Sequence, residues 1–233
     1  MGEWSKCEYD RSELPSRCFI FAGMTPNVLI EKILRNFQKV LYTKHDNYNP
    51  YIVEYEKEEI TLIFQVYGAA MIADILKILK DGNTKEIIFI GSAYGISTDL
   101  HVGDCVISEK VQCLDGITNL LDNVEYAYPN MILTKKIGQL IATEMTCKTG
   151  KTVSVPTTFW HPDHNRFDKD AIALEMEYSA FCYFSMKLAM DVSGILVISD
   201  TIEHSLLDDR SLRYNNILKA FELVLAKFEV VKD

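Results

Sequence analysis

Two stretches of four consecutive apolar residues constrain this chain most, Ile87–Ile90 and Ile195–Ile198. Both are rich in β-branched residues and neither shows the alternation of a strand with one solvated face. Short runs of this kind are typical of strands that are buried on both faces of a sheet. Such strands need helices packed on either side, so the sequence predicts a central sheet between two helical layers.

The rest of the chain alternates between strand-like and helix-like segments. The predicted strands share β-branched or aromatic residues between Gly, Asp or Asn boundaries: Cys18–Ala22, Ile60–Val66, Glu86–Gly91, Asp104–Glu109, Lys151–Val155, Ala171–Met176 and Gly194–Ser199. The predicted helices share apolar residues three or four positions apart: Pro26–Val40, Ala69–Lys80, Leu133–Cys147, Tyr178–Met190 and Asp208–Lys227. This alternation predicts an α/β protein, a single-domain three-layer α/β/α fold with a central mixed sheet. Residues 1–233 form one domain in this interpretation, with 1–17 as an N-terminal extension.

Two segments lack this periodicity. Residues Asp115–Asn130 have the weakest pattern, which favours a surface loop. The acidic segment Glu54–Glu59 is typical of a solvated hairpin.

Composition excludes several classes of function. The net charge of −9 argues against a nucleic-acid interface, which needs a basic face. No run reaches the roughly 18 apolar residues of a membrane span, and Met1–Arg17 does not resemble a signal peptide, so we expect a cytoplasmic protein. The cysteines are scattered without a CxxC pair, which favours free thiols in a reducing compartment; they are Cys7, Cys18, Cys105, Cys113, Cys147 and Cys182.

Polar residues that could act in catalysis or ligand binding occur at the ends of three of the predicted strands. Ser92 lies in a Gly-Ser-Ala-Tyr-Gly turn that either approaches an anion or simply leaves a buried strand. Glu175 and Glu177 follow a buried-type run, where they either grip vicinal hydroxyls or begin a helix. Asp200 follows Ile195–Ile198 and is either a general acid or a turn residue. Spacing alone does not decide between these alternatives.

Taken together, these motifs resemble the nucleoside phosphorylase superfamily, which includes purine nucleoside phosphorylases, uridine phosphorylases and methylthioadenosine nucleosidases. The resemblance rests on a strand ending in Gly-Ser-Ala-x-Gly, then Leu-Glu-Met-Glu about eighty residues later, then Ile-Ser-Asp. It extends from Cys18 to Lys227, nearly the whole chain.

The resemblance implies a role for each matching position. Glu177 binds the ribose 2′- and 3′-hydroxyls, Met176 packs beneath the sugar, and Glu175 shapes this contact. Phe159 stacks on the base, which Ser199 also contacts. Asp200 is the catalytic acid at purine N7. For the phosphate or the attacking water, the matching residues are Ser92, Gly23 and Gly68.

The chain departs from the family where the nucleophile binds. Phosphorolytic members hold phosphate with three arginines, and the matching positions are Asn27, Asp46 (or His45) and Phe89. Nucleosidases place a Glu near the position of Asn27 to activate water. The uridine-specific Gln and Arg pair is not in register in Phe159–Arg166, which favours a purine.

We therefore expect cleavage of the N-glycosidic bond of a purine nucleoside, with phosphate or water as the acceptor. The alternative is a catalytically degenerate nucleoside-binding protein. The resemblance implies a homo-oligomer, from dimer to hexamer, and no cofactor beyond phosphate as a co-substrate. His161, Asp163 and His164 are too few ligands for a typical zinc site, so no metal is expected.

Overall fold

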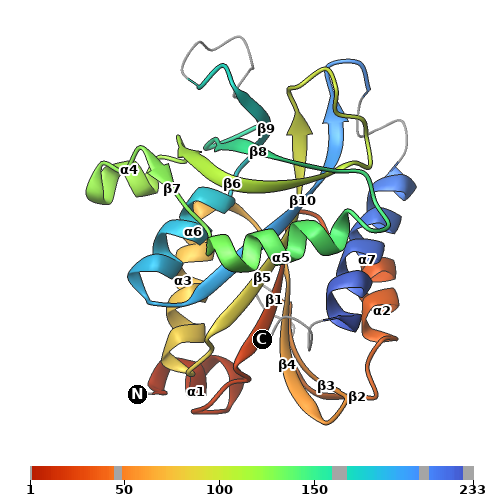
Figure 1. Ribbon diagram of the computed structural model, residues 1–233. Coiled ribbons are helices and arrows are strands. Elements are labelled where there is room, and N and C mark those ends of the chain that lie inside the picture. Colours follow the sequence, from red (N-terminus) through yellow and green to blue (C-terminus); the bar gives the residue numbers. More distant parts are fainter. Residues whose placement is uncertain (1, 45–48, 159–166, 205–209, 228–233) are drawn as a thin grey trace.

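The computed structural model describes residues 2–44, 49–158, 167–204 and 210–227 (Figure 1). Strands and helices alternate along these residues in the following order: α1 (Glu3–Tyr9), β1 (Arg17–Ala22), α2 (Asn27–Leu34), β2 (Lys39–Thr43), β3 (Asn49–Tyr55), β4 (Glu58–Val66), α3 (Gly68–Asp81), β5 (Glu86–Gly95), β6 (Cys105–Cys113), α4 (Ile117–Asp122), β7 (Tyr126–Ala127), α5 (Met131–Ile141), β8 (Cys147–Ser154), β9 (Ala171–Glu175), α6 (Tyr178–Lys187), β10 (Asp191–Thr201) and α7 (Arg210–Ala226). The predicted α/β class and mixed sheet are confirmed.

The strands form one sheet whose order is β10-β6-β8-β9-β5-β1-β4-β3-β2. Strand β1 runs parallel to both β4 and β5, and β10 runs parallel to β5 over its whole length. Strand β10 also pairs antiparallel with β6, so β5, β9, β8, β6 and β10 close into a ring. This closure brings the ends of β5, β9 and β10 close together.

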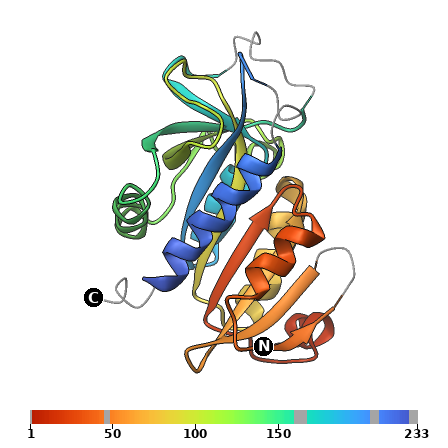
Figure 2. The ribbon, with the colours of Figure 1, turned by 90° about the vertical axis from the view of Figure 1, so that its right-hand side faces the viewer.

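Helices cover both faces of the sheet, as the continuous apolar strands require. Alternate residues of β1 face opposite layers: Cys18 and Ile20 pack with α3 and α6, whereas Phe19 and Phe21 pack with α2, α5 and α7. Figure 2 shows α2 and α7 side by side over the second face. Each face therefore has its own apolar core.

All six cysteines lie in described residues and carry free thiols.

The structure corrects several predicted boundaries. Strands β5 and β10 run past the predicted ends, to Gly95 and Thr201, so Ser92 and Asp200 lie within strands and are not turn residues. Helix α2 stops at Leu34, and strand β2 begins at Lys39, before the predicted end of the helix at Val40. The tail of the predicted helix Leu133–Cys147 is likewise not helical, because α5 ends at Ile141.

The segment 115–130, expected to be a loop, contains α4 and β7. The side chain of Asp115 accepts hydrogen bonds from the backbone N–H groups of Ile117 and Thr118, which fixes the first turn of α4. The predicted hairpin at Glu54–Glu59 is confirmed, since β3 and β4 pair antiparallel around it. Within the described residues, no helix has both the length and the apolar character needed to cross a bilayer.

Gly194 gives a test of this packing. It pairs with Phe89 between β10 and β5, and a Cβ at Gly194 would lie 2.4 Å from Cε2 of Tyr178. We expect Gly194→Ala to lower the free energy of unfolding by about 1–3 kcal/mol, because the Tyr178 ring must shift. Urea denaturation measures this change.

Gly138→Ala in α5 is the matched control. A Cβ there would meet Ile107 at 3.6 Å, an ordinary contact, so we expect a gain of about 0.5–1 kcal/mol from helix propensity. A Gly194→Ala variant as stable as the Gly138→Ala variant would contradict the close approach of β10 to α6.

Candidate active site

A pocket of about 580 Å³ lies at the carboxyl ends of β1, β5 and β10. This is the edge where open α/β sheets commonly bind ligands, and the volume suits a small molecule. The predicted site residues that line it are Gly23, Ser92, Glu175, Met176, Glu177, Ser199 and Asp200. Segments far apart in the sequence therefore meet at one cavity.

Glu175, at the end of β9, is a buried carboxyl that is fully engaged in hydrogen bonds. Its Oε2 accepts from the backbone N–H groups of Glu177 at 2.6 Å and Tyr178 at 2.5 Å, which begin α6. Its Oε1 is hydrogen-bonded to the hydroxyl of Ser154 at the end of β8. Burial, and then the charge of Glu177, raise the pKa of Glu175 to about 8. The hydrogen bonds from Ser154, Glu177 and Tyr178 oppose this rise.

Glu177 is the second buried carboxyl, with 5% of its surface exposed. Its Oε1 accepts a hydrogen bond of 2.7 Å from the backbone N–H of Gly68, at the start of α3. Gly68 has φ of 75°, a conformation that favours glycine. Burial raises the pKa of Glu177 to about 7, although the N–H groups of Gly68 and Met176 oppose the rise. Gly68 is thus placed behind Glu177 and is not among the residues that line the pocket.

Asp200 lies where the β10–β5 register shifts, between Ile198 and Asp200. Irregular strand pairing of this kind can redirect a side chain next to a site. The hydroxyl of Ser199 donates a hydrogen bond of 2.7 Å to Oδ2 of Asp200 and lies 3.3 Å from the carbonyl of Ala93. The charge of Asp200 adds to burial in raising the pKa of Tyr94, so the two side chains share the same part of the pocket.

The structure therefore assembles one carboxylate pair and one separate carboxylate around the cavity. Phe159, predicted to stack on the base, lies outside the described residues. The His161, Asp163 and His164 group lies outside them as well. Among the residues that the structure describes, no cluster of three or more metal-ligating side chains occurs.

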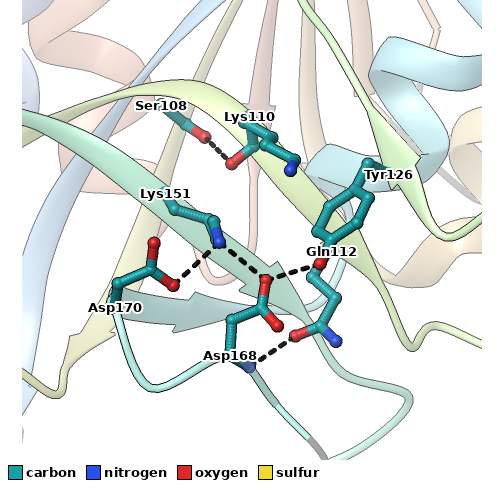
Figure 3. Close-up of polar contacts among 7 residues, drawn as sticks. All are labelled: Ser108, Lys110, Gln112, Tyr126, Lys151, Asp168 and Asp170. Carbon is teal, nitrogen blue, oxygen red and sulfur yellow. Dashed lines mark hydrogen bonds and ion pairs between the residues drawn. The ribbon is translucent and has the colours of Figure 1, made fainter.

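A polar cluster on β6, β7 and β8 holds the residues that lead into β9 (Figure 3). Nζ of Lys151 lies 2.7 Å from Asp168 and 2.8 Å from Asp170. The hydroxyl of Tyr126 donates to Asp168 at 2.7 Å, and the backbone N–H of Asp168 donates to Gln112 at 2.9 Å. The pKa of Asp168 is lowered, first by Lys151 and then by Tyr126. These contacts hold in place the residues that precede β9, the strand that ends at Glu175.

Arg213 is the site residue that sequence reasoning missed. It lies on α7, lines the pocket and is 5% exposed. Its guanidinium donates a hydrogen bond of 2.9 Å to the carbonyl of Met24, which follows β1. The sequence predicts a helix over Asp208–Lys227, but the helical pattern does not mark Arg213 as a functional residue.

The positions that match the family's arginines are placed apart from this cation. Phe89 is fully buried and packs against Tyr178 and Phe181 with ring centroids 5.2 Å apart in each pair. Asn27 is exposed at the start of α2 and does not line the pocket. His45 and Asp46 lie outside the described residues. Neither Phe89 nor Asn27 is therefore among the residues that line this cavity.

A model of the phosphorylase superfamily matches residues 19–228, almost the whole chain. The chain belongs to this superfamily. Among curated proteins, a purine nucleoside phosphorylase of the DeoD type from Lactococcus lactis is 24% identical over 151 residues. That alignment covers 61% of this chain and 64% of the relative, somewhat less than two thirds of its length.

Several solved structures share the fold of this chain at low sequence identity. A 5′-methylthioadenosine/S-adenosyl homocysteine nucleosidase from Campylobacter jejuni has a TM-score of 0.77 at 17% identity, covering 92% of this chain and 99% of that one. A uridine phosphorylase from Vibrio fischeri has a TM-score of 0.78 at 16% identity, covering 93% and 92%. A futalosine hydrolase mutant from Helicobacter pylori has a TM-score of 0.75 at 14% identity, covering 92% and 99%. Similarity at this level shows the fold.

Glu175 gives a prediction about stability and pH. Its pKa is about 8 in the folded protein against an ordinary value of 4.5, so between these values the folded chain retains a proton that the unfolded chain has lost. Raising the pH through this window therefore lowers the stability of the folded state. Glu175→Gln imitates the protonated acid, because its amide oxygen can accept from Glu177 and Tyr178 while its NH₂ faces Ser154.

We expect Glu175→Gln to match the wild type near pH 5 and to exceed it at pH 9 by on the order of 4 kcal/mol. Urea denaturation at both pH values measures the difference, with the exposed Glu144→Gln as control. A constant stability difference between variant and wild type across this range would show that Glu175 does not retain its proton.

Proposed function

We propose that this protein cleaves the N-glycosidic bond of a purine nucleoside, with phosphate or water as the acceptor. The single observation that carries the proposal is the presence of Glu177 and Asp200 in one pocket. Their side chains come from different strand ends, and the pocket has the size of a small-molecule site. Membership of the superfamily and the partial match to a purine nucleoside phosphorylase support the same reaction class.

The chemistry divides between the two carboxyl groups. Glu177, once ionised, accepts hydrogen bonds from the ribose 2′- and 3′-hydroxyls and fixes the sugar. As the bond between C1′ and the base breaks, its electron pair goes to the base, and Asp200 supplies a proton or hydrogen bond at N7. An oxygen of the acceptor forms the new bond to C1′; when the acceptor is water, one of its O–H bonds breaks and the proton goes to solvent, from which Asp200 regains its own. Water gives ribose and phosphate gives ribose 1-phosphate, and no further cofactor is needed.

A nucleoside-binding protein without turnover is the second candidate. It is favoured by one observation, the replacement of an expected phosphate ligand by Phe89, whose ring is buried in the core. This candidate predicts thermal stabilisation by nucleosides without release of base.

Asp200→Asn tests the catalytic proposal. We expect kcat to fall by about 10²- to 10⁴-fold, because the acid is replaced by an amide of the same shape. Chromatography of free base from inosine, guanosine, adenosine, methylthioadenosine and uridine, each with and without phosphate, measures the activity. The exposed Asp99→Asn is the control. Undiminished turnover in Asp200→Asn would remove Asp200 from the reaction, and absent turnover in the wild type would favour the binding protein.

Glu177 predicts the pH dependence of substrate capture. Because its pKa is about 7 and the ionised form accepts the ribose hydroxyls, kcat/KM should rise as the pH increases through 7. Glu177→Gln should lower kcat/KM by about 10- to 100-fold and abolish this rising limb. The pH–rate profiles of the two proteins check this. A limb that persists in Glu177→Gln would belong to another group.

A further inference from the structure

Tyr94 lines the pocket, and the proposed chemistry gives it no task. The pairing of β5 with β10 determines its neighbour, because Ala93 pairs with Ile198 whereas Tyr94 pairs with Asp200. Ser199 is thus an extra residue in β10, a bulge that moves Asp200 by one position. Directly paired residues of neighbouring strands point to the same face of a sheet, so Tyr94 lies beside the proposed catalytic acid.

The other neighbours of Tyr94 are apolar. On the opposite side of β5, Tyr94 pairs with Leu174 of β9. Its ring packs against the apolar cluster that includes Val155 and Leu174, and both of these residues line the pocket. The ring therefore has apolar side chains on one side and a carboxyl group on the other, which restricts the positions that the phenol can adopt.

The hydroxyl of Tyr94 is available to a ligand as a hydrogen-bond donor. The residue is partly buried, and its hydroxyl forms no hydrogen bond within the part of the chain that the structure describes. Burial, and then the charge of Asp200, raise the pKa of Tyr94, so the phenol keeps its proton well above neutral pH. When a ligand shields such a hydroxyl from water, binding is costly unless the ligand accepts a hydrogen bond from it.

One edge of a purine offers this acceptor next to N7, but only in one class of base. A 6-oxopurine presents two adjacent acceptors there, N7 and O6, whereas adenine presents N7 next to the donor N6 amino group. In the proposed reaction, Asp200 supplies a proton or hydrogen bond at N7. A second donor beside Asp200 therefore matches O6 better than it matches an amino group.

We propose that Tyr94 donates a hydrogen bond to O6 of the base and makes the site selective for 6-oxopurine nucleosides over 6-aminopurine nucleosides. The inference rests on the proposed function and names the substrate class of the same site. When the bond between C1′ and the base breaks, the electron pair spreads over the ring to N7 and O6. Asp200 serves N7, and the hydrogen bond from Tyr94 strengthens as negative charge develops on O6. Tyr94 keeps its own proton throughout, so it determines specificity and is not a second acid.

Tyr94→Phe tests this role, because it removes the hydroxyl and keeps the ring that packs on Val155 and Leu174. Base release gives kcat/KM for three nucleosides that differ only at C6 of the base: inosine has an oxo group, adenosine an amino group and purine riboside a hydrogen. Tyr128→Phe, at an exposed tyrosine that does not line the pocket, is the matched control.

We expect the wild type to prefer inosine to adenosine, and Tyr94→Phe to lower kcat/KM for inosine by about 10- to 100-fold, because the lost hydrogen bond is made to a developing charge. For adenosine and purine riboside the change should stay below about 3-fold. An equal loss with all three nucleosides would show that Tyr94 serves packing alone. Unchanged kcat/KM for inosine, or a wild type that prefers adenosine, likewise overturns the inference.

Binding of the free bases separates this inference from the proposed function. Calorimetric titrations with hypoxanthine and adenine measure the preference for the 6-oxo group without turnover. Tighter binding of hypoxanthine by the wild type, lost in Tyr94→Phe, supports the inference even if no nucleoside is cleaved, a result that would remove the enzyme. Cleavage of nucleosides with no effect of Tyr94→Phe on any of them supports the enzyme and overturns the inference.

Discussion

The hydrogen bonds of Glu175 hold together the strand ends and the helix start that line the pocket. One carboxyl joins the end of β9 to the first turn of α6 and, through Ser154, to the end of β8. Ser154 in turn accepts from the backbone N–H of Ser179 at 2.7 Å, and the hydroxyl of Ser179 donates to Asp115 at 2.7 Å. The position of Glu177 follows from these bonds, because its own N–H is one of the donors. A buried polar network of this type is stable only when each member is satisfied.

The same burial that makes the network rigid determines its charge. Three acidic side chains around one small cavity would repel each other strongly if all were ionised. Burial raises the pKa of Glu175 more than that of Glu177, to about 8 against about 7. Glu175 is thus the harder of the two carboxyls to ionise, whereas Glu177 can ionise when a ligand offers hydrogen-bond donors. Two neighbouring residues of the same type are divided into different tasks by their surroundings.

Much of this arrangement could be predicted from the sequence. The apolar runs Ile87–Ile90 and Ile195–Ile198 predicted central strands, and the structure places them side by side in β5 and β10. The Leu-Glu-Met-Glu and Ile-Ser-Asp motifs predicted residues that the structure brings to one pocket. Sequence periodicity failed to predict an element whose formation depends on a tertiary contact. Helix α4 depends on Asp115, whose carboxylate also binds Ser179 from a distant element, and periodicity does not report such a bond.

Arg213 shows the limit of motif reasoning more sharply. Resemblance directs attention to positions where related chains carry a functional residue, so a cation supplied from another element is passed over. In this fold, β1 and α7 are separated by most of the chain yet meet at Met24 and Arg213. A helix can therefore deliver charge to the segment after β1 while the core takes over a position such as Phe89 for packing. The requirement that persists is physical, since a pocket with several carboxylates can hold an anion only if some element brings a buried cation to it.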